Sequence, residues 1–175
     1  MQLSLETDTP KIYVACLAAY NAGILHGEWI DATKDLDDMW RELRNILASS
    51  PIPQAEEWAI HDSESFGDVR ISEYESMERI HELACWIGDH DEIGILALNR
   101  CEGDIEKADE ALENYMGCYT GLADYAQALT EETTEIPKSL VYYIDYERMG
   151  RDMERNGDVF TIETRFDQVH VFLNH

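Results

Sequence analysis

The sequence is poor in basic residues: it has 13 Lys and Arg among 175 residues, and they do not gather in any segment. Affinity for nucleic acids and anionic membranes comes largely from clustered Lys and Arg, so direct binding to either is disfavoured. The chain also lacks a basic leader followed by an apolar stretch, and its longest apolar-rich run, residues 12–20, is too short to cross a bilayer. We therefore expect a soluble, cytoplasmic protein with no nucleic acid or membrane partner.

Paired cysteines and the usual signatures of cofactor-binding enzymes are absent as well. The four cysteines, which form no CxxC pair, are Cys16, Cys85, Cys101 and Cys118. Their wide spacing favours reduced thiols over a zinc ribbon or a redox site. There is no dinucleotide-binding glycine pattern and no P-loop, because Gly23-x-x-x-Gly27 lacks the lysine that contacts phosphate. The sequence predicts no cofactor, and we expect a protein that is not an enzyme.

Two short patterns imitate parts of metal sites. His81 and Cys85 are four residues apart, which would place them on one face of a helix like half of a zinc site, but the sequence shows no second half. Asp89 begins an acidic run that imitates a calcium loop, yet Arg100 stands where the bidentate glutamate would be. We therefore expect no metal, with His81 and Cys85 packed in the core or placed at the surface.

Acid is what the sequence has in excess, since 37 Asp and Glu give a net charge of −24. These residues are spread through segments that also carry core residues, so they must lie on the surface of the folded protein rather than in a detachable tail. Repulsion among these charges destabilises the folded state. A protein that keeps them is therefore expected to use the negative electrostatic field that they create. The alternative is a solvated acidic surface that keeps the protein soluble, as in proteins adapted to high salt.

The hydrophobic pattern predicts an α+β fold that begins with a mixed unit. Strands are expected at residues 11–17, 28–30 and 57–60, with an amphipathic helix at 35–48. From Ser72 the period becomes helical: Ser72 and Glu75 fit a capping box that would start a helix, and further helices are expected at 92–98 and 104–116.

The last part of the chain returns to a mixed pattern. A helix at 122–129 and a partly helical segment at 142–155 precede a turn at residues 156–158, and strands at 159–163 and 169–173 form a terminal hairpin. We predict an elongated molecule of three small domains in series: a mixed α/β domain at 1–61, a helical domain at 62–103 and a mixed α/β domain at 104–175. The tyrosines of the last third are assigned to a core or a subunit interface.

The acidic residues become most uniform near the start of the third domain, because residues 108–137 contain no Lys or Arg. Acids three or four apart on a helix lie about 5–6 Å from one another, a spacing comparable to that of neighbouring phosphates. A chain of this length spans about 40 Å, over which B-DNA carries roughly 24 charges. The candidate carboxylates that would stand in for phosphates are Glu106, Asp109, Glu110, Glu113, Asp124, Glu131, Glu132 and Glu135.

Several separated blocks resemble, in order, the ArdA antirestriction proteins. Residues 10–32 read PKIYVACLAAYNAGILHGEWIDA, and later blocks are EWAIHD at 57–62, YYIDY at 142–146 and NGDVF at 156–160. The resemblance implies a DNA mimic, often carried by conjugative elements, that binds the DNA-binding groove of type I restriction-modification enzymes. It also implies an elongated three-domain protomer, a homodimer formed through the C-terminal region and an antirestriction segment near residues 126–140.

The resemblance turns the acidic pattern into a functional hypothesis. We expect stoichiometric inhibition, with the candidate carboxylates facing the methyltransferase core of the enzyme and with Tyr115, Tyr119 and Tyr125 at the dimer interface. One alternative is an acidic chaperone or scaffold for another basic DNA-binding protein, such as a nucleoid protein. Another is an acidic enzyme that uses a carboxylate site without a recognisable motif.

Overall fold

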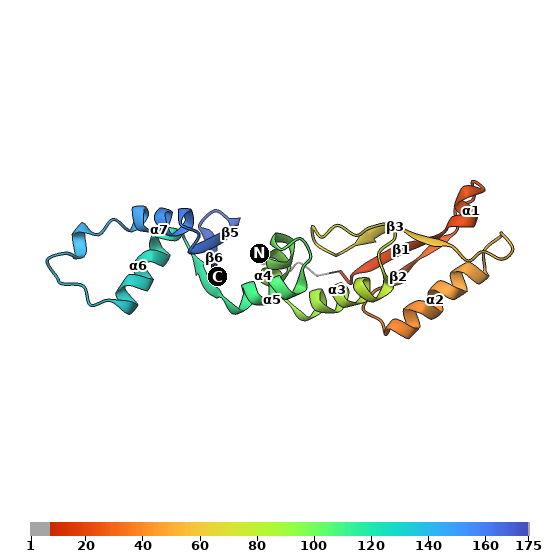
Figure 1. Ribbon diagram of the computed structural model, residues 1–175, viewed down its shortest axis with the longest axis horizontal. Helices are drawn as coiled ribbons and strands as arrows, with labels where there is room; N and C mark the ends of the chain where they lie inside the picture. The colour runs from red at the N-terminus through yellow and green to blue at the C-terminus, as the bar shows by residue number, and fades with distance from the viewer. Residues whose placement is uncertain (1–7, 175) are drawn as a thin grey trace, which may run out of the picture. The chain divides into compact units, whose positions relative to one another are not determined.

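The computed structural model describes residues 8–174, which fall into two compact units, one extending to Ala108 and one beginning at Asp109. The described residues form seven α-helices and two small antiparallel sheets (Figure 1). The predicted α+β fold class is confirmed. The expected domains at 1–61 and 62–103 both lie in the N-terminal unit, and the division into three domains stays a prediction.

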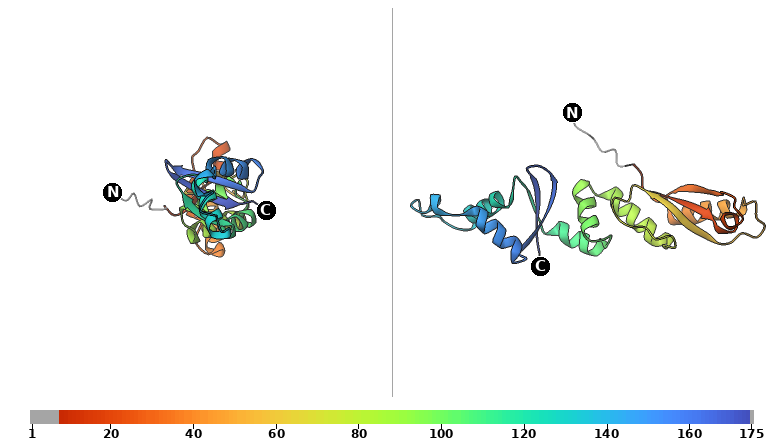
Figure 2. Two further views of the ribbon diagram at one scale, coloured as in Figure 1. Left: turned by 90° about the vertical axis from the view of Figure 1, so that its left-hand side faces the viewer. Right: turned by 90° about the horizontal axis from the view of Figure 1, so that it is seen from above.

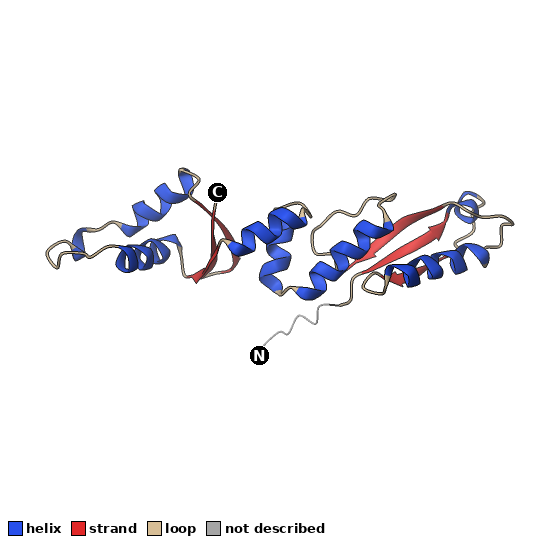
Figure 3. Cartoon of the chain, turned by 60° about the horizontal axis from the view of Figure 1, so that its bottom comes forward, coloured by secondary structure: helices blue, strands red, loops and turns tan. Residues whose placement is uncertain are grey.

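The N-terminal unit is built on a three-stranded antiparallel sheet, seen as red arrows in Figure 3. Its strands are β1 (Lys11–Cys16), β2 (Gly27–Asp31) and β3 (Trp58–Glu64), in the order β2-β1-β3. The central strand buries Ile12 and Val14, which pair with Ile30 and Ile60. All three predicted strands are confirmed, although β1 ends at Cys16, where the short helix α1 (Leu17–Asn21) begins.

Helices complete the core of this unit. α2 (Leu36–Ala48) covers one face of the sheet (Figures 1 and 3) and buries Met39, Leu43 and Ile46, at the spacing of one helical face. α3 (Met77–Asp89), α4 (Glu92–Arg100) and α5 (Ile105–Glu113) follow, and Ile80 and Leu98 join the same apolar cluster. Each fully buried side chain of this size contributes about 1.5–3 kcal/mol, so the cluster supplies the main stabilisation of the unit.

The predicted start of α3 is wrong. The helix begins at Met77, and the Ser76 hydroxyl caps it by accepting a hydrogen bond from the Arg79 N–H at 3.2 Å. The preceding segment is held by the sheet, because the Ile60 N–H donates to the Glu73 carbonyl at 2.9 Å. The Ser72 box therefore lies in a turn, and the helix starts one turn later than the pattern indicates.

The C-terminal unit contains the second sheet, with strands β4 (Tyr115–Tyr119), β5 (Val159–Arg165) and β6 (Gln168–Leu173) in the order β4-β6-β5. The predicted terminal hairpin of β5 and β6 is confirmed. The helix expected to reach Met116 ends instead at Glu113, and the chain continues into β4, which the sequence analysis missed. Gly117, with φ of 117°, lies where the pairing of β4 with β6 shifts register, a conformation that favours glycine.

A helix pair lies at one end of this sheet (Figures 1 and 2). α6 (Leu122–Thr133) and α7 (Tyr146–Arg155) are joined by a segment that includes one turn of 3₁₀ helix, Val141–Tyr143. They approach closely at Gly150, where a Cβ atom would lie 2.8 Å from the Leu122 carbonyl oxygen. Within residues 8–174, none of the helices combines the length and apolar character that a membrane span requires.

Candidate acidic binding surface

The four candidate carboxylates of α5 share one exposed stripe. Glu106, Asp109, Glu110 and Glu113 are all exposed, whereas Ala108 and Ala111 on the remaining surface of the helix are buried. Residues three or four apart are neighbours on a helix, so the stripe forms the row that the spacing predicts. Like charges at these spacings weaken an isolated helix by a few tenths of a kcal/mol per pair, which packing of the apolar side must offset.

The one basic residue within α5 does not neutralise this row. The Lys107 ammonium lies 3.0 Å from the Asp104 carboxylate, and the Lys107 N–H donates to the same group at 3.1 Å. The N–H and the ammonium together hold the pKa of Asp104 below its usual value, and the hydrogen bond to Asp104 raises the pKa of Lys107. The positive charge is therefore directed to the start of the helix, away from Glu110 and Glu113.

The remaining candidates lie on or just after α6. Asp124, Glu131 and Glu132 are exposed on the helix, and Glu135 is exposed after its end. Two of them are oriented by neighbouring side chains: the Thr120 hydroxyl donates to Asp124, and the Gln127 amide donates to Glu131 at 2.8 Å. A carboxylate has about four acceptor sites, so each keeps most of its capacity for a cationic partner.

Both units are acidic, but they differ in how their basic residues are used. Residues 1–108 contain 23 Asp and Glu against 8 Lys and Arg, and residues 109–175 contain 14 against 5. In the N-terminal unit Lys11, Lys34, Arg41, Arg79 and Lys107 each form an ion pair with a nearby carboxylate, and in the C-terminal unit Arg148 pairs with Asp152. Because acids outnumber bases in both ranges, each unit keeps a surplus of carboxylates.

The predicted interface tyrosines occupy different depths of the C-terminal unit. Tyr115 and Tyr119 lie on β4 and are partly exposed; the Tyr115 hydroxyl is 2.8 Å from Nδ1 of buried His170, and Tyr119 packs edge-on against Tyr125. Tyr125 is 2% exposed and forms a core cluster with Val159 and Val171. Burial raises the pKa of Tyr125. Tyr115 and Tyr119 therefore keep part of their surface exposed, whereas Tyr125 lies in the core, and the dimer interface at these three residues stays a prediction.

An exposed apolar run lies between α6 and α7, where the sequence analysis expected a core or an interface. Tyr142 and Tyr143 are 92% and 82% exposed, and Leu140 and Val141 beside them are also exposed. A core role within the described residues is thus excluded for these two tyrosines. Contiguous exposed apolar side chains are typical of interaction surfaces, so an interface is the interpretation that remains.

The two metal-like patterns have local structural roles. The His81 ring contacts the Ala32 carbonyl at 3.1 Å, and the Cys85 sulfur lies 3.7 Å from the same ring. Burial, followed by the charge of Asp89, raises the pKa of the Cys85 thiol, which keeps it protonated and poorly reactive. Asp91, from the calcium-like run, caps α4. Among residues 8–174, no group of three or more potential ligands is placed to hold a metal ion.

The chain matches a protein-family model over most of its length. The family model described as antirestriction protein (ArdA) matches residues 12–168. The chain belongs to the ArdA family of antirestriction proteins. No curated protein matches the sequence. The resemblance seen in the sequence is confirmed, and the region shared with the ArdA family contains all eight candidate carboxylates and the three tyrosines.

Proposed function

We propose that this protein inhibits type I restriction-modification enzymes by occupying, stoichiometrically, the groove in which they bind DNA. Membership of the ArdA family supports an antirestriction role. The observation that carries the finer proposal is that all eight candidate carboxylates are exposed, four of them in one row along α5. No bond is made or broken by this chain in the proposed mechanism, because its carboxylates act as fixed negative charges.

The energetics of such a surface come from many weak contacts. An exposed ion pair contributes about 0–1 kcal/mol, so no single carboxylate of the row dominates binding. Lys and Arg side chains that normally contact DNA phosphates would contact the row instead, and salt would screen these contacts. Binding should therefore compete with DNA and weaken as the salt concentration rises.

The proposed inhibitor is a homodimer formed through the C-terminal unit. That unit has a small core, and small cores are commonly stabilised by oligomerisation. Tyr115 and Tyr119 on β4 supply partly exposed rings with polar tips, a type of side chain enriched at subunit interfaces. Sedimentation of the wild-type protein and of a Tyr115→Asp, Tyr119→Asp variant checks this arrangement, with a monomer expected only for the variant.

A competition assay tests the proposed inhibition directly. A type I methyltransferase core is bound to labelled DNA at about 50 mM salt and titrated with the purified protein, and the assay is repeated at about 200 mM salt. We expect displacement at low salt and clear weakening at high salt. Absence of displacement at low salt would overturn the proposal. A pull-down that recovers nucleoid proteins and no restriction subunit would instead support an acidic scaffold.

Two matched variants separate the α5 row from net charge alone. The row variant carries Asp109→Asn, Glu110→Gln and Glu113→Gln; the control carries Asp89→Asn, Glu78→Gln and Glu92→Gln, which are exposed acids of the N-terminal unit. At about 0.5 kcal/mol for each contact, the row variant should bind about tenfold more weakly than wild type. Equal weakening in both variants would show that only the total charge matters.

A further inference from the structure

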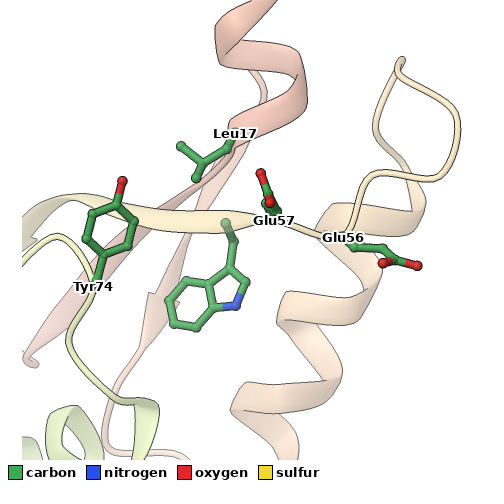
Figure 4. Close-up of a pocket in the computed structure, with 5 residues that line it drawn as sticks. Leu17, Glu56, Glu57 and Tyr74 are labelled. Carbon is green, nitrogen blue, oxygen red and sulfur yellow. The ribbon is translucent and has the colours of Figure 1, made fainter.

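A pocket of about 430 Å³ opens on the N-terminal unit beside the start of β3 (Figure 4). Five residues line it, namely Leu17, Glu56, Glu57, Trp58 and Tyr74. In Figure 4 the Leu17 and Glu57 side chains project on the same side of the β3 ribbon, with Leu17 drawn between Tyr74 and Glu57, and the Glu56 carboxylate points away from Tyr74. Of the two acids, Glu57 is the one on the side of Leu17.

Backbone hydrogen bonds hold the walls of this pocket together. The Leu17 N–H donates to the Glu57 carbonyl at 3.0 Å, which ties α1 to the beginning of β3. The Ile60 N–H donates to the Glu73 carbonyl at 2.9 Å, which ties the segment carrying Tyr74 to the same strand. Trp58 packs edge-on against Trp40, with ring centroids 6.2 Å apart. These bonds fix the backbone of the pocket walls, from which the exposed side chains of Glu57 and Tyr74 project.

The lining is suited to a cation that also has an apolar or planar part. Tyr74 is 70% exposed, and Glu56 and Glu57 are exposed and take part in none of the ion pairs found among residues 8–174. Lys and Arg are absent from the lining. Rings of Trp and Tyr attract cations at their faces, and a carboxylate accepts two parallel N–H bonds from a guanidinium.

The same sheet already holds one cation by this combination of groups. The Lys11 ammonium lies 5.1 Å from the ring centroid of Trp29 and 2.8 Å from the Glu64 carboxylate. An aromatic face and a carboxylate therefore hold a basic side chain within this sheet. The pocket offers aromatic rings, Tyr74 and Trp58, and carboxylates, Glu56 and Glu57, in its lining, which includes no Lys or Arg.

We propose that this pocket binds the guanidinium group of an arginine side chain presented by a protein partner. Arginine fits better than lysine because its planar, weakly hydrated group stacks on aromatic rings while donating two hydrogen bonds in parallel. The assignment of that arginine to a restriction enzyme rests on the proposed function. In that setting, Tyr74 and Glu57 imitate a base and a phosphate together, where the α5 row imitates phosphates alone.

Binding of the amino acid itself can be measured without any enzyme. N-acetyl-arginine methylamide and its neutral citrulline analogue are titrated into the ¹⁵N-labelled full-length protein, and the four tryptophan indole signals are followed. Arginine should shift the Trp58 signal and leave the Trp86 signal, which comes from a ring stacked on His90, unchanged. Equal shifts with citrulline, or equal responses of Trp58 and Trp86, would overturn the pocket.

Variants of exposed residues identify the groups that act. Tyr74→Ala should weaken arginine binding about twofold to fivefold, and Tyr74→Phe should restore it, because the phenyl face keeps the attraction for a cation. Glu57→Gln should weaken binding to arginine and not to citrulline. Unchanged affinity in Tyr74→Ala would overturn the proposal, and unchanged indole spectra in the free variants check that the fold is intact.

The DNA competition assay then distinguishes the pocket from the proposed function. If the wild-type protein displaces DNA from the methyltransferase but does not bind arginine, the pocket proposal fails alone. If arginine binds and the Tyr74 variants behave as expected, yet the wild-type protein never displaces DNA, the inhibition proposal fails and the pocket stands. If both hold, Tyr74→Ala should displace DNA less effectively than Tyr74→Phe.

Discussion

Each unit contains a three-stranded antiparallel sheet, but the central strand occupies opposite positions in the chain order. In the N-terminal unit the central strand, β1, comes first in the chain, whereas in the C-terminal unit the central strand, β6, comes last. Their cores differ more: among the described residues, 21 buried apolar residues lie before Asp109 and six after it. The C-terminal unit therefore has the smaller reserve of stability, and it also contains most of the stretch without Lys or Arg.

The difference in core size indicates in which unit charge repulsion lowers the stability more. Self-repulsion lowers the stability of both units, but a large core tolerates it better than a small one. The C-terminal unit also exposes Tyr142 and Tyr143, which would be stabilised by a partner. A second subunit would then supply what the small core lacks. The following changes test the comparison, beginning with the largest expected effect.

Phe172→Ala should separate the two units most clearly. Phe172 is fully buried and stacks on Phe160 with centroids 4.9 Å apart, so truncation should cost about 3–5 kcal/mol. All four tryptophans lie before Asp109, so tryptophan fluorescence reports the N-terminal unit, while circular dichroism reports both. In urea, we expect part of the circular dichroism transition to move to lower concentration while the fluorescence midpoint stays.

The matched control for Phe172→Ala is Ile80→Ala, in the buried face of α3. This variant should lower the fluorescence midpoint and leave the C-terminal part of the circular dichroism transition in place. If either variant shifted both signals equally, the two units would unfold as one cooperative block. The difference in stability between the two cores would then be contradicted.

One glycine in each unit gives a pair of substitutions with opposite signs. A Cβ at Gly150 would lie 2.8 Å from the Leu122 carbonyl oxygen, so Gly150→Ala should force α6 and α7 apart and cost about 1–3 kcal/mol. Gly88, near the end of α3, has no atom within 4 Å of the corresponding position, and Gly88→Ala should stabilise by about 0.5 kcal/mol. Thermal unfolding measures both, and a stable Gly150→Ala would contradict the close packing of the helix pair.

Helix caps provide a smaller and more even test. Ser76 caps α3 by accepting from Arg79, and Asp145 caps α7 by accepting from Arg148 at 2.9 Å. Replacement of either by Ala should cost about 1 kcal/mol. The same loss should lower the melting temperature more for Asp145→Ala, because its unit is smaller. Ser72→Ala is the control and should leave the stability unchanged. A loss of stability equal to that of Ser76→Ala would indicate that Ser72, and not Ser76, caps the helix.

Local periodicity predicted much of this protein. The strands around Ile12, Ile30 and Ile60, the helix α2 and the row on α5 follow from residue spacing alone, because each pattern lies within one element. β4 was missed because its partner β6 lies some fifty residues further on, and Tyr115 to Tyr119 gains a ladder only from that pairing. The helix start at Met77 was missed for a similar reason, since a bond from β3 holds the preceding segment.

The candidate sites divide in the same way. Exposure of the α5 carboxylates could be predicted. Four acids at helical spacing lie on the face opposite Ala108 and Ala111, and that face must be in contact with solvent. The pocket could not, because Trp58 and Tyr74 are brought together by the bond between Ile60 and Glu73, which leaves no trace in the sequence. The pocket therefore depends on tertiary contacts and cannot be predicted from the composition of the sequence.

The smallest expected effect concerns Asp104, which caps the start of α5 at the end of the N-terminal unit. Its pKa is lowered in the folded protein by the N–H and the ammonium of Lys107, so the ionised form favours folding. This contribution is present above the unfolded pKa of about 3.9 and is lost as the pH falls through the lower folded value. Asp104→Asn keeps a capping side chain but not the charge. The melting temperature followed by tryptophan fluorescence should therefore be slightly lower for the variant at pH 7, and the difference should vanish near pH 2. A difference that persisted at pH 2 would show that the side chain acts through packing rather than charge.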